Sequence, residues 1–117
     1  DYKAQSKEGT VETVDYLENE YRQGYKIQMD IYVYILRQMK FKVSDTAYFL
    51  VCNGLKTPDK FDATLQFDLT LVPYKTNDSW IKNKIIDMKK TLESKDVPEL
   101  NKYCEKCMYL ITGKSFI

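Results

Sequence analysis

The chain has 117 residues, of which 44% are apolar, and it carries 18 basic and 17 acidic side chains but no histidine. This length is typical of one globular domain, and the near balance of charge excludes a strongly basic surface over the whole chain. The absence of histidine excludes catalysis by a Ser-His or Cys-His pair and every histidine-ligated zinc site. Any chemistry must therefore use carboxylate, lysine, tyrosine or cysteine side chains.

Hydropathy and cysteine usage predict the compartment. No apolar run approaches the ~20 residues that a membrane span needs, so we expect no membrane partner. The three cysteines leave one unpaired in any pairing scheme, unlike the disulfide framework of a secreted mini-protein. The sequence therefore predicts a cytoplasmic protein. Because it begins at Asp1 without an initiator methionine, we also expect it to be a fragment of a longer chain.

The first third of the chain predicts a strand end, a connection and a helix. Residues 1–6 are short and become polar, as in the tail of a strand that began earlier. Residues 7–20 are rich in acidic side chains, which is typical of a solvated connection with some helix. Residues 20–40 contain no proline and are apolar on most faces, which predicts a buried helix.

The middle of the chain predicts an antiparallel hairpin. Residues 45–54 form an apolar run that ends in the turn signal Asn53-Gly54, which predicts a core strand. Residues 55–62 predict a loop. Residues 63–74 alternate between apolar and polar side chains, which predicts a half-buried strand whose apolar side holds Leu65, Phe67, Leu69 and Leu71.

The last third predicts a helix and a tail. Asn77-Asp78-Ser79 can cap a helix, and apolar residues then follow at helical spacing: Ile81, Ile85, Met88 and Leu92. Residues 96–117 form a tail that bears two cysteines. The order of elements predicts an α/β or α+β domain with a mixed sheet flanked by helices, whose first strands lie outside this sequence.

The first candidate for chemistry is Asp1-x-Lys3 at the end of the first strand. Alternation along a strand puts both side chains on one face, about 7 Å apart along the chain. A carboxylate there can bind a divalent cation while the ammonium faces the same water or phosphate, as metal-assisted phosphodiester cleavage requires. The alternative is an exposed ion pair at a strand end.

The second candidate is Gln28-x-x-x-Tyr32 within the predicted helix. The spacing puts the amide and the phenol on one helix face. Such groups need polar partners when they are buried among apolar side chains, and a phosphate, a metal-bound water or Lys3 could supply them. The alternative is that Tyr32 is a core aromatic residue and Gln28 a surface residue.

The order of Asp1-x-Lys3, Gln28-x-x-x-Tyr32 in a helix and a following core strand resembles the C-terminal half of a PD-(D/E)XK nuclease of the RecB-like branch. The resemblance covers roughly the first three quarters of the chain. It implies a restriction-endonuclease-like mixed sheet, with residues 1–117 as the C-terminal portion of a single nuclease-like domain.

The same resemblance implies roles for individual residues. Asp1 looks like the second acidic metal ligand, and the main-chain carbonyl of Tyr2 is similar in place to one with which the family binds the same ion. Lys3 looks like the lysine that positions the attacking water and stabilises charge on the phosphate. Gln28 and Tyr32 resemble the pair that braces the site and contacts DNA phosphate. The implied cofactor is Mg²⁺ or Mn²⁺, which suits an oxygen-rich site without histidine.

The implied function is a Mg²⁺/Mn²⁺-dependent deoxyribonuclease that acts on DNA, of exonuclease type, in DNA repair, recombination or phage replication. The upstream acidic residues of the family are not among these 117 residues. We therefore expect the chain to be inactive unless another subunit or the missing N-terminal segment completes the site. The alternative is a catalytically incomplete nuclease-like module that binds DNA or serves as a scaffold in a larger complex.

Two further pairs complete the candidates. Cys104-x-x-Cys107 resembles part of the iron–sulfur site of some RecB-like nucleases and could also bind zinc, but either site needs more ligands. The alternatives are reduced, half-buried thiols or the remnant of a lost site. Lys40 and Lys42 follow the Gln28 helix, and the family comparison makes them candidate DNA-binding residues.

Overall fold

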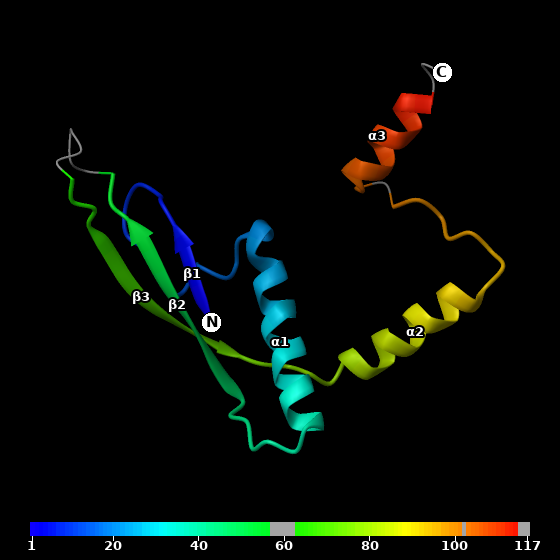
Figure 1. The fold of residues 1–117 in the computed structure, drawn as a ribbon, viewed down its shortest axis with the longest axis horizontal. Helices are drawn as coiled ribbons and strands as arrows, with labels where there is room; N and C mark the ends of the chain where they lie inside the picture. The colour runs from blue at the N-terminus through cyan, green and yellow to red at the C-terminus, as the bar shows by residue number, and fades with distance from the viewer. Residues whose placement is uncertain (57–62, 102, 115–117) are drawn as a thin grey trace. The chain divides into compact units, whose positions relative to one another are not determined.

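The computed structural model describes residues 1–56, 63–101 and 103–114. The chain forms two compact units, Asp1–Ile81 and Lys82–Ile117. The first unit contains a sheet and a helix, and the second contains helical segments (Figure 1).

Three strands form the sheet of the first unit, in the order β1-β2-β3. They are β1 (Tyr2–Gln5), β2 (Thr46–Gly54) and β3 (Phe67–Lys75). The first two strands are parallel, with Lys3 opposite Val51, and the last two are antiparallel, with Val51 opposite Thr70. A mixed sheet and an antiparallel hairpin are thereby confirmed, and with the helices they make the fold α+β.

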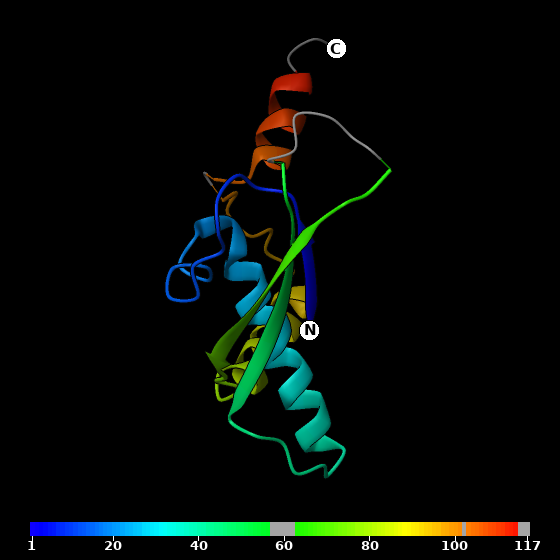
Figure 2. The same cartoon turned by 90° about the vertical axis from the view of Figure 1, so that its left-hand side faces the viewer.

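Helix α1 (Gln23–Gln38) packs on one face of this sheet and follows a short 3₁₀ turn, η1 (Glu20–Arg22) (Figures 1 and 2). Met29 of the helix joins Phe49, Val51 and Val72 of the strands in the core. Residues from the connection before the helix complete this core: Tyr16 and Leu17. The solvated connection expected over residues 7–20 is wrong at these two positions, because α1 leaves part of the sheet face for them to cover.

The prediction that α1 is buried on most faces is also wrong. Only Met29, Asp30 and Val33 of the helix are buried. One sheet face can cover only one stripe of a helix, so the remaining apolar side chains are exposed at the surface of the described chain: Ile27, Ile31, Ile35 and Leu36.

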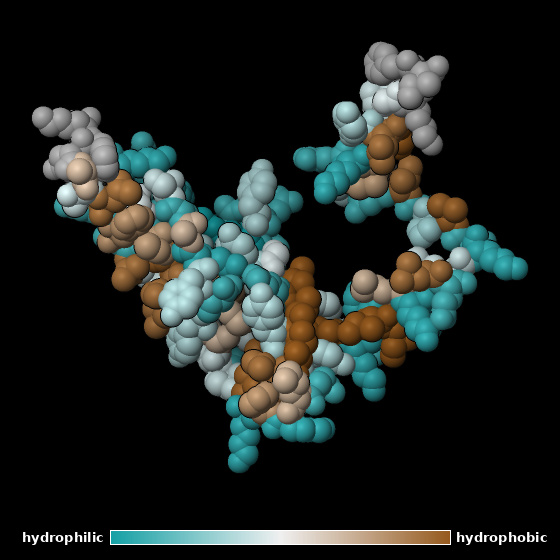
Figure 3. Space-filling view, in the orientation of Figure 1, coloured by the Kyte–Doolittle hydropathy of each residue, from teal (hydrophilic) through white to brown (hydrophobic). Residues whose placement is uncertain are grey.

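The alternation predicted for β3 is present, but the buried side was predicted wrongly. Val72 is fully buried and faces α1 with half-buried Tyr74, whereas the opposite face of β3 is exposed: Phe67, Leu69 and Leu71. Figure 3 shows these hydrophobic side chains as a brown band along β3. A period of two defines two faces, but it does not say which of them meets the helix.

The turn predicted at Asn53-Gly54 is wrong, because both residues belong to β2. Asn53 is fully buried, and its side-chain amide bonds the main chain of the segment after β1. Its oxygen accepts from the main-chain nitrogen of Lys7 at 2.9 Å, and its nitrogen donates to the carbonyls of Lys7 and Gly9. The ladder continues from Leu55 to Gln66, and most of the predicted loop, residues 57–62, lies outside the described residues.

A buried carboxylate, Asp30, holds the connection that follows β3. Its two oxygens accept from the main-chain nitrogen of Asn77 at 2.9 Å and from the indole nitrogen of Trp80 at 3.1 Å. Burial, together with the charge of Asp30 and a hydrogen bond to it, raises the pKa of Tyr74 to about 12. The carboxylate therefore joins α1 and β3 to the connection that follows β3.

The second unit contains most of α2 (Ile81–Glu93) and all of α3 (Glu105–Lys114). The predicted helix from Ile81 is confirmed. None of the helices described here is long and apolar enough to cross a bilayer.

Candidate functional site

Asp1 and Lys3 lie side by side at the start of β1, as strand alternation predicts. The main-chain nitrogen of Asp1 donates to the carbonyl of Tyr48, and the carbonyl of Asp1 accepts from Leu50 at 2.8 Å. These bonds fix Asp1 against β2. The Asp1 carboxylate then pairs with the Lys3 ammonium at 2.9 Å, and the Lys3 side chain is only 15% exposed. The pair is therefore more enclosed than a simple surface ion pair.

Gln28 and Tyr32 reach the same place from α1. The ammonium of Lys3 donates to Oε1 of Gln28 at 2.8 Å, and Nε2 of Gln28 donates to the hydroxyl oxygen of Tyr32 at 2.6 Å. The four residues form one continuous chain of polar contacts, Asp1–Lys3–Gln28–Tyr32, which we call the Lys3 chain. Tyr32 is 46% exposed, so it is not the core residue that the alternative required.

The residue that sequence reasoning missed in this site is Tyr25. Its ring lies beside the Lys3 ammonium, with 4.0 Å between Nζ and the ring centroid, a cation–π distance. The ring also packs against Phe49 of the core, with 6.2 Å between centroids. Tyr25 precedes Gln28 by three positions and so shares its helix face, which was the available signal in the sequence.

The hydrogen bonds of the Lys3 chain leave one donor, the Tyr32 hydroxyl, without an acceptor among the described residues. The hydroxyl oxygen of Tyr32 accepts from Gln28, so its own hydrogen is free to donate to another group at this exposed position. The charges of Asp1 and Lys3 balance each other. The site can thus offer an ammonium, a carboxylate and a phenol donor to one ligand without a large local field.

The oxygen donors expected for a divalent cation are the Asp1 carboxylate and the Tyr2 carbonyl. Because the Asp1 carbonyl points to β2, alternation turns the Tyr2 carbonyl to the other edge of β1, which pairs with no strand among the described residues. Hard cations prefer such donors. The two donors fit Mg²⁺ or Mn²⁺ in kind, but two protein ligands alone would hold such an ion weakly.

Lys40 and Lys42 are exposed beyond the end of α1 and take no part in the Lys3 chain. Lys40 adopts a positive φ of 68°. The main-chain nitrogen of Phe41 donates to the carbonyl of Leu36, and that of Lys40 to Arg37, which is the bonding pattern of a Schellman motif. Lys40 therefore ends the helix, whatever else it does.

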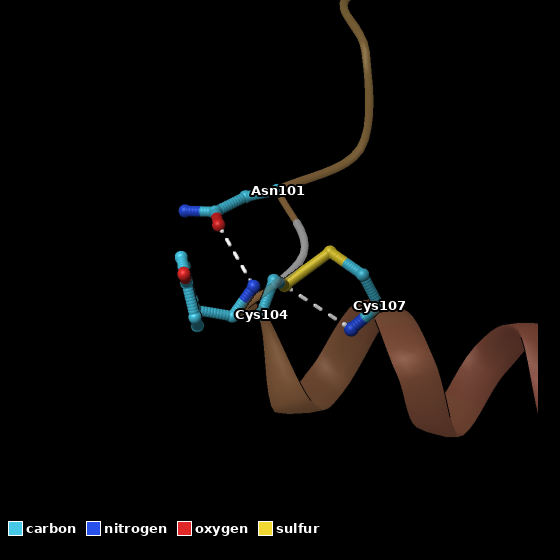
Figure 4. The surroundings of a disulfide bond; sticks show 4 residues. Asn101, Cys104 and Cys107 are labelled. Atoms are coloured by element: carbon cyan, nitrogen blue, oxygen red, sulfur yellow. Dashed lines mark hydrogen bonds between the residues drawn. A yellow bond between two sulfur atoms is a disulfide. The ribbon is translucent and has the colours of Figure 1, made fainter.

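Cys104 and Cys107 are joined in a disulfide at the start of α3, and so are not the reduced thiols of one alternative (Figure 4). Both side chains are half-buried. Among the described residues, no group of three or more histidine, cysteine, aspartate or glutamate side chains is placed to hold a metal ion. The zinc and iron–sulfur assignments stay predictions.

Comparisons of the chain with protein-family models, with curated proteins and with solved structures find no match.

Proposed function

We propose that the Lys3 chain is part of the active site of a metal-dependent DNA nuclease. The observation that carries the proposal is the continuous contact from Asp1 through Lys3 and Gln28 to Tyr32. These are the side chains that the resemblance to RecB-like nucleases selects, and they come from two elements far apart in the sequence. A surface with no common ligand would not require that all four meet.

Each residue has a role that its contacts support. The Lys3 ammonium lies where it can stabilise negative charge on a bound phosphate, and Gln28 and the Tyr25 ring hold it in place. The Tyr32 hydroxyl can donate to a phosphate oxygen. The Asp1 carboxylate and the Tyr2 carbonyl would bind the cation. When bound, Mg²⁺ or Mn²⁺ lowers the pKa of a water molecule and polarises the phosphoryl oxygen.

The finer assignment stays part of the proposal. It includes an exonuclease type of cleavage, action in DNA repair, recombination or phage replication, and a cytoplasmic location. It also includes a further carboxylate from outside the described site, supplied by another subunit or by a preceding segment, because Asp1 is the one acidic side chain of the Lys3 chain. Lys40 and Lys42 would extend the contact with DNA.

A second candidate is a nuclease-like module that binds DNA without cleaving it. The ion pair between Asp1 and Lys3 favours it, because a carboxylate already neutralised by an ammonium at 2.9 Å attracts a cation less strongly. In that case Lys3 and Tyr32 would bind phosphate, and Asp1 would position Lys3.

The test gives linear and circular DNA, with Mg²⁺ or Mn²⁺, to the full-length protein, which includes the preceding segment that the proposal requires, and it follows both binding and cleavage. We expect cleavage of linear DNA, and Lys3→Ala should lower its rate by about 100-fold or more. Lys75→Ala, which removes an exposed lysine at the end of β3, is the matched control and should have no effect. Binding that depends on Lys3 without any cleavage would support the second candidate. If the protein neither binds nor cleaves DNA, both candidate functions are contradicted.

A further inference from the structure

The Cys104–Cys107 disulfide lies within a single turn at the start of α3. Cys104 directly precedes Glu105, the first residue of the helix, and its main-chain nitrogen donates to the carbonyl of Asn101 at 3.0 Å. The two cysteines are separated by 3 positions, so the bond links α3 to no other element. Disulfides stabilise folds most when they close long loops. This bond therefore contributes little as a cross-link of the fold.

The two sulfur atoms have different surroundings. The main-chain nitrogen of Cys107 donates to Sγ of Cys104 at 3.1 Å (Figure 4). Cys104 thus accepts a hydrogen bond from the first turn of the helix, as the side chain of an N-cap residue does. The first N–H groups of a helix have no partner within it and favour negative charge. Among the described residues, no corresponding donor faces Sγ of Cys107. After reduction, this arrangement favours the thiolate form of Cys104 over that of Cys107.

We infer that Cys104 and Cys107 form a reversible dithiol–disulfide couple, in which Cys104 is the sulfur that exchanges with external thiols and disulfides. Two half-buried cysteines in a Cys-x-x-Cys turn at a helix start are the arrangement in which such exchange is fast. The inference does not depend on the proposed nuclease function.

The oxidising reaction starts from the two thiols and an external disulfide. The Cys104 thiolate attacks one sulfur of that disulfide, its S–S bond breaks, and one external thiolate leaves. The Cys107 thiolate then attacks Sγ of Cys104, and the second external thiolate leaves. The two protons lost by the cysteines are taken up by the external thiolates. The chain loses two electrons and the external disulfide gains them, and the reverse reaction reduces the pair.

The first experiment places the full chain in mixtures of reduced and oxidised glutathione, quenches with acid and alkylates the free thiols for mass spectrometry. We expect both thiols to appear and disappear together as the ratio changes, while Cys52 stays free, and Cys52→Ser to behave in the same way. A pair that stays reduced, or stays oxidised, across all mixtures would overturn the inference. So would purified protein that holds zinc or a cluster on the pair and forms no disulfide.

The second experiment identifies the exchanging sulfur. It compares two variants that each keep a single cysteine, C52S/C107S and C52S/C104S, in their rates of alkylation by iodoacetamide near neutral pH. Cys104 should react about tenfold faster or more, because the thiolate is the nucleophile. In oxidised glutathione, Cys107→Ser should accumulate a mixed disulfide faster than Cys104→Ser. Equal rates, or a faster Cys107, would contradict the role of Cys104, and helical circular dichroism checks that α3 is retained in both variants.

Discussion

Lys3 on β1 donates a hydrogen bond to Gln28 on α1 over 2.8 Å, although the two residues are 25 positions apart in the sequence. The bond spans the contact between the sheet and α1, so the geometry of the Lys3 chain depends on how α1 packs. That packing rests on Met29, the residue next to Gln28, which is buried in the core with Phe49, Val51 and Val72 of the strands. The site and the core are therefore built by the same helix.

Removing the hydroxyl of Tyr32 should separate a role in binding from a role in folding. Tyr32→Phe deletes the acceptor of Gln28 at an exposed position, so we expect a loss of about 1 kcal/mol or less in the free energy of unfolding. DNA affinity should fall, because the donor to phosphate is lost. Urea unfolding and fluorescence anisotropy measure the two effects.

The matched control is Tyr21→Phe, which removes the hydroxyl of a tyrosine that is 94% exposed and should change neither quantity. A large loss of stability in Tyr32→Phe with unchanged DNA affinity would instead make Tyr32 a structural residue.

The sequence was informative where the chain follows a local period. Asp1 and Lys3 share a face because a strand alternates, and Gln28 and Tyr32 share one because a helix repeats. The face of each element that would be buried was not predictable in this way. The leucines of β3 resemble a core stripe, yet Val72 faces α1. That choice depends on how the strands and α1 come together, which no single segment encodes.

Single residues with tertiary roles were the other part that local patterns could not give. Asn53 resembles a turn residue, but its side-chain amide forms hydrogen bonds with the main chain of the segment after β1. Asp30 resembles a charged surface residue of a helix, but it accepts from Asn77 and Trp80 in a buried position. Each is explained only by partners more than 40 positions away, with separations of 46 for Asn53 and Lys7 and 50 for Asp30 and Trp80.

Alanine substitutions at neighbouring positions of β3 test which face is the core. Val72→Ala should lower the free energy of unfolding by about 2–3 kcal/mol, because it empties a fully buried position. Leu71→Ala removes a larger side chain but from the exposed face, and should cost under about 1 kcal/mol. Chemical denaturation measures both. The reverse order of costs would mean that the leucine face is the buried one.

Lys40 offers a test that separates helix termination from DNA contact. Its positive φ is costly for a residue with a side chain, so Lys40→Gly should raise the free energy of unfolding by about 0.5–1 kcal/mol. Lys42→Gly removes the same charge at an exposed position without the Schellman role, and should bring no such gain. Thermal unfolding measures this difference.

The DNA affinity of the same two variants tests the binding prediction. If both lysines contact phosphate, both variants should bind DNA more weakly, and the salt dependence of binding should become shallower by about one unit in each. Unchanged affinity and salt dependence would remove these lysines from the interface, and the stability difference would remain as the sole effect of position 40.

Stability at alkaline pH should depend on Tyr74. Its pKa is raised to about 12 by burial and by Asp30, from the ordinary value of 10.0. The phenol is protonated in both states below pH 10, so its contribution to stability is complete there. Above pH 10 the unfolded chain loses this proton while the folded chain keeps it, so the contribution is lost as pH rises towards 12. Urea midpoints between about pH 9 and pH 11.5 should therefore fall less steeply in Tyr74→Phe than in the wild type.

Tyr16, whose pKa is also raised by burial, should leave part of this pH dependence in the Tyr74→Phe variant. Tyr21→Phe should keep the wild-type slope, and an equal slope in Tyr74→Phe would show that the phenol of Tyr74 ionises alike in both states.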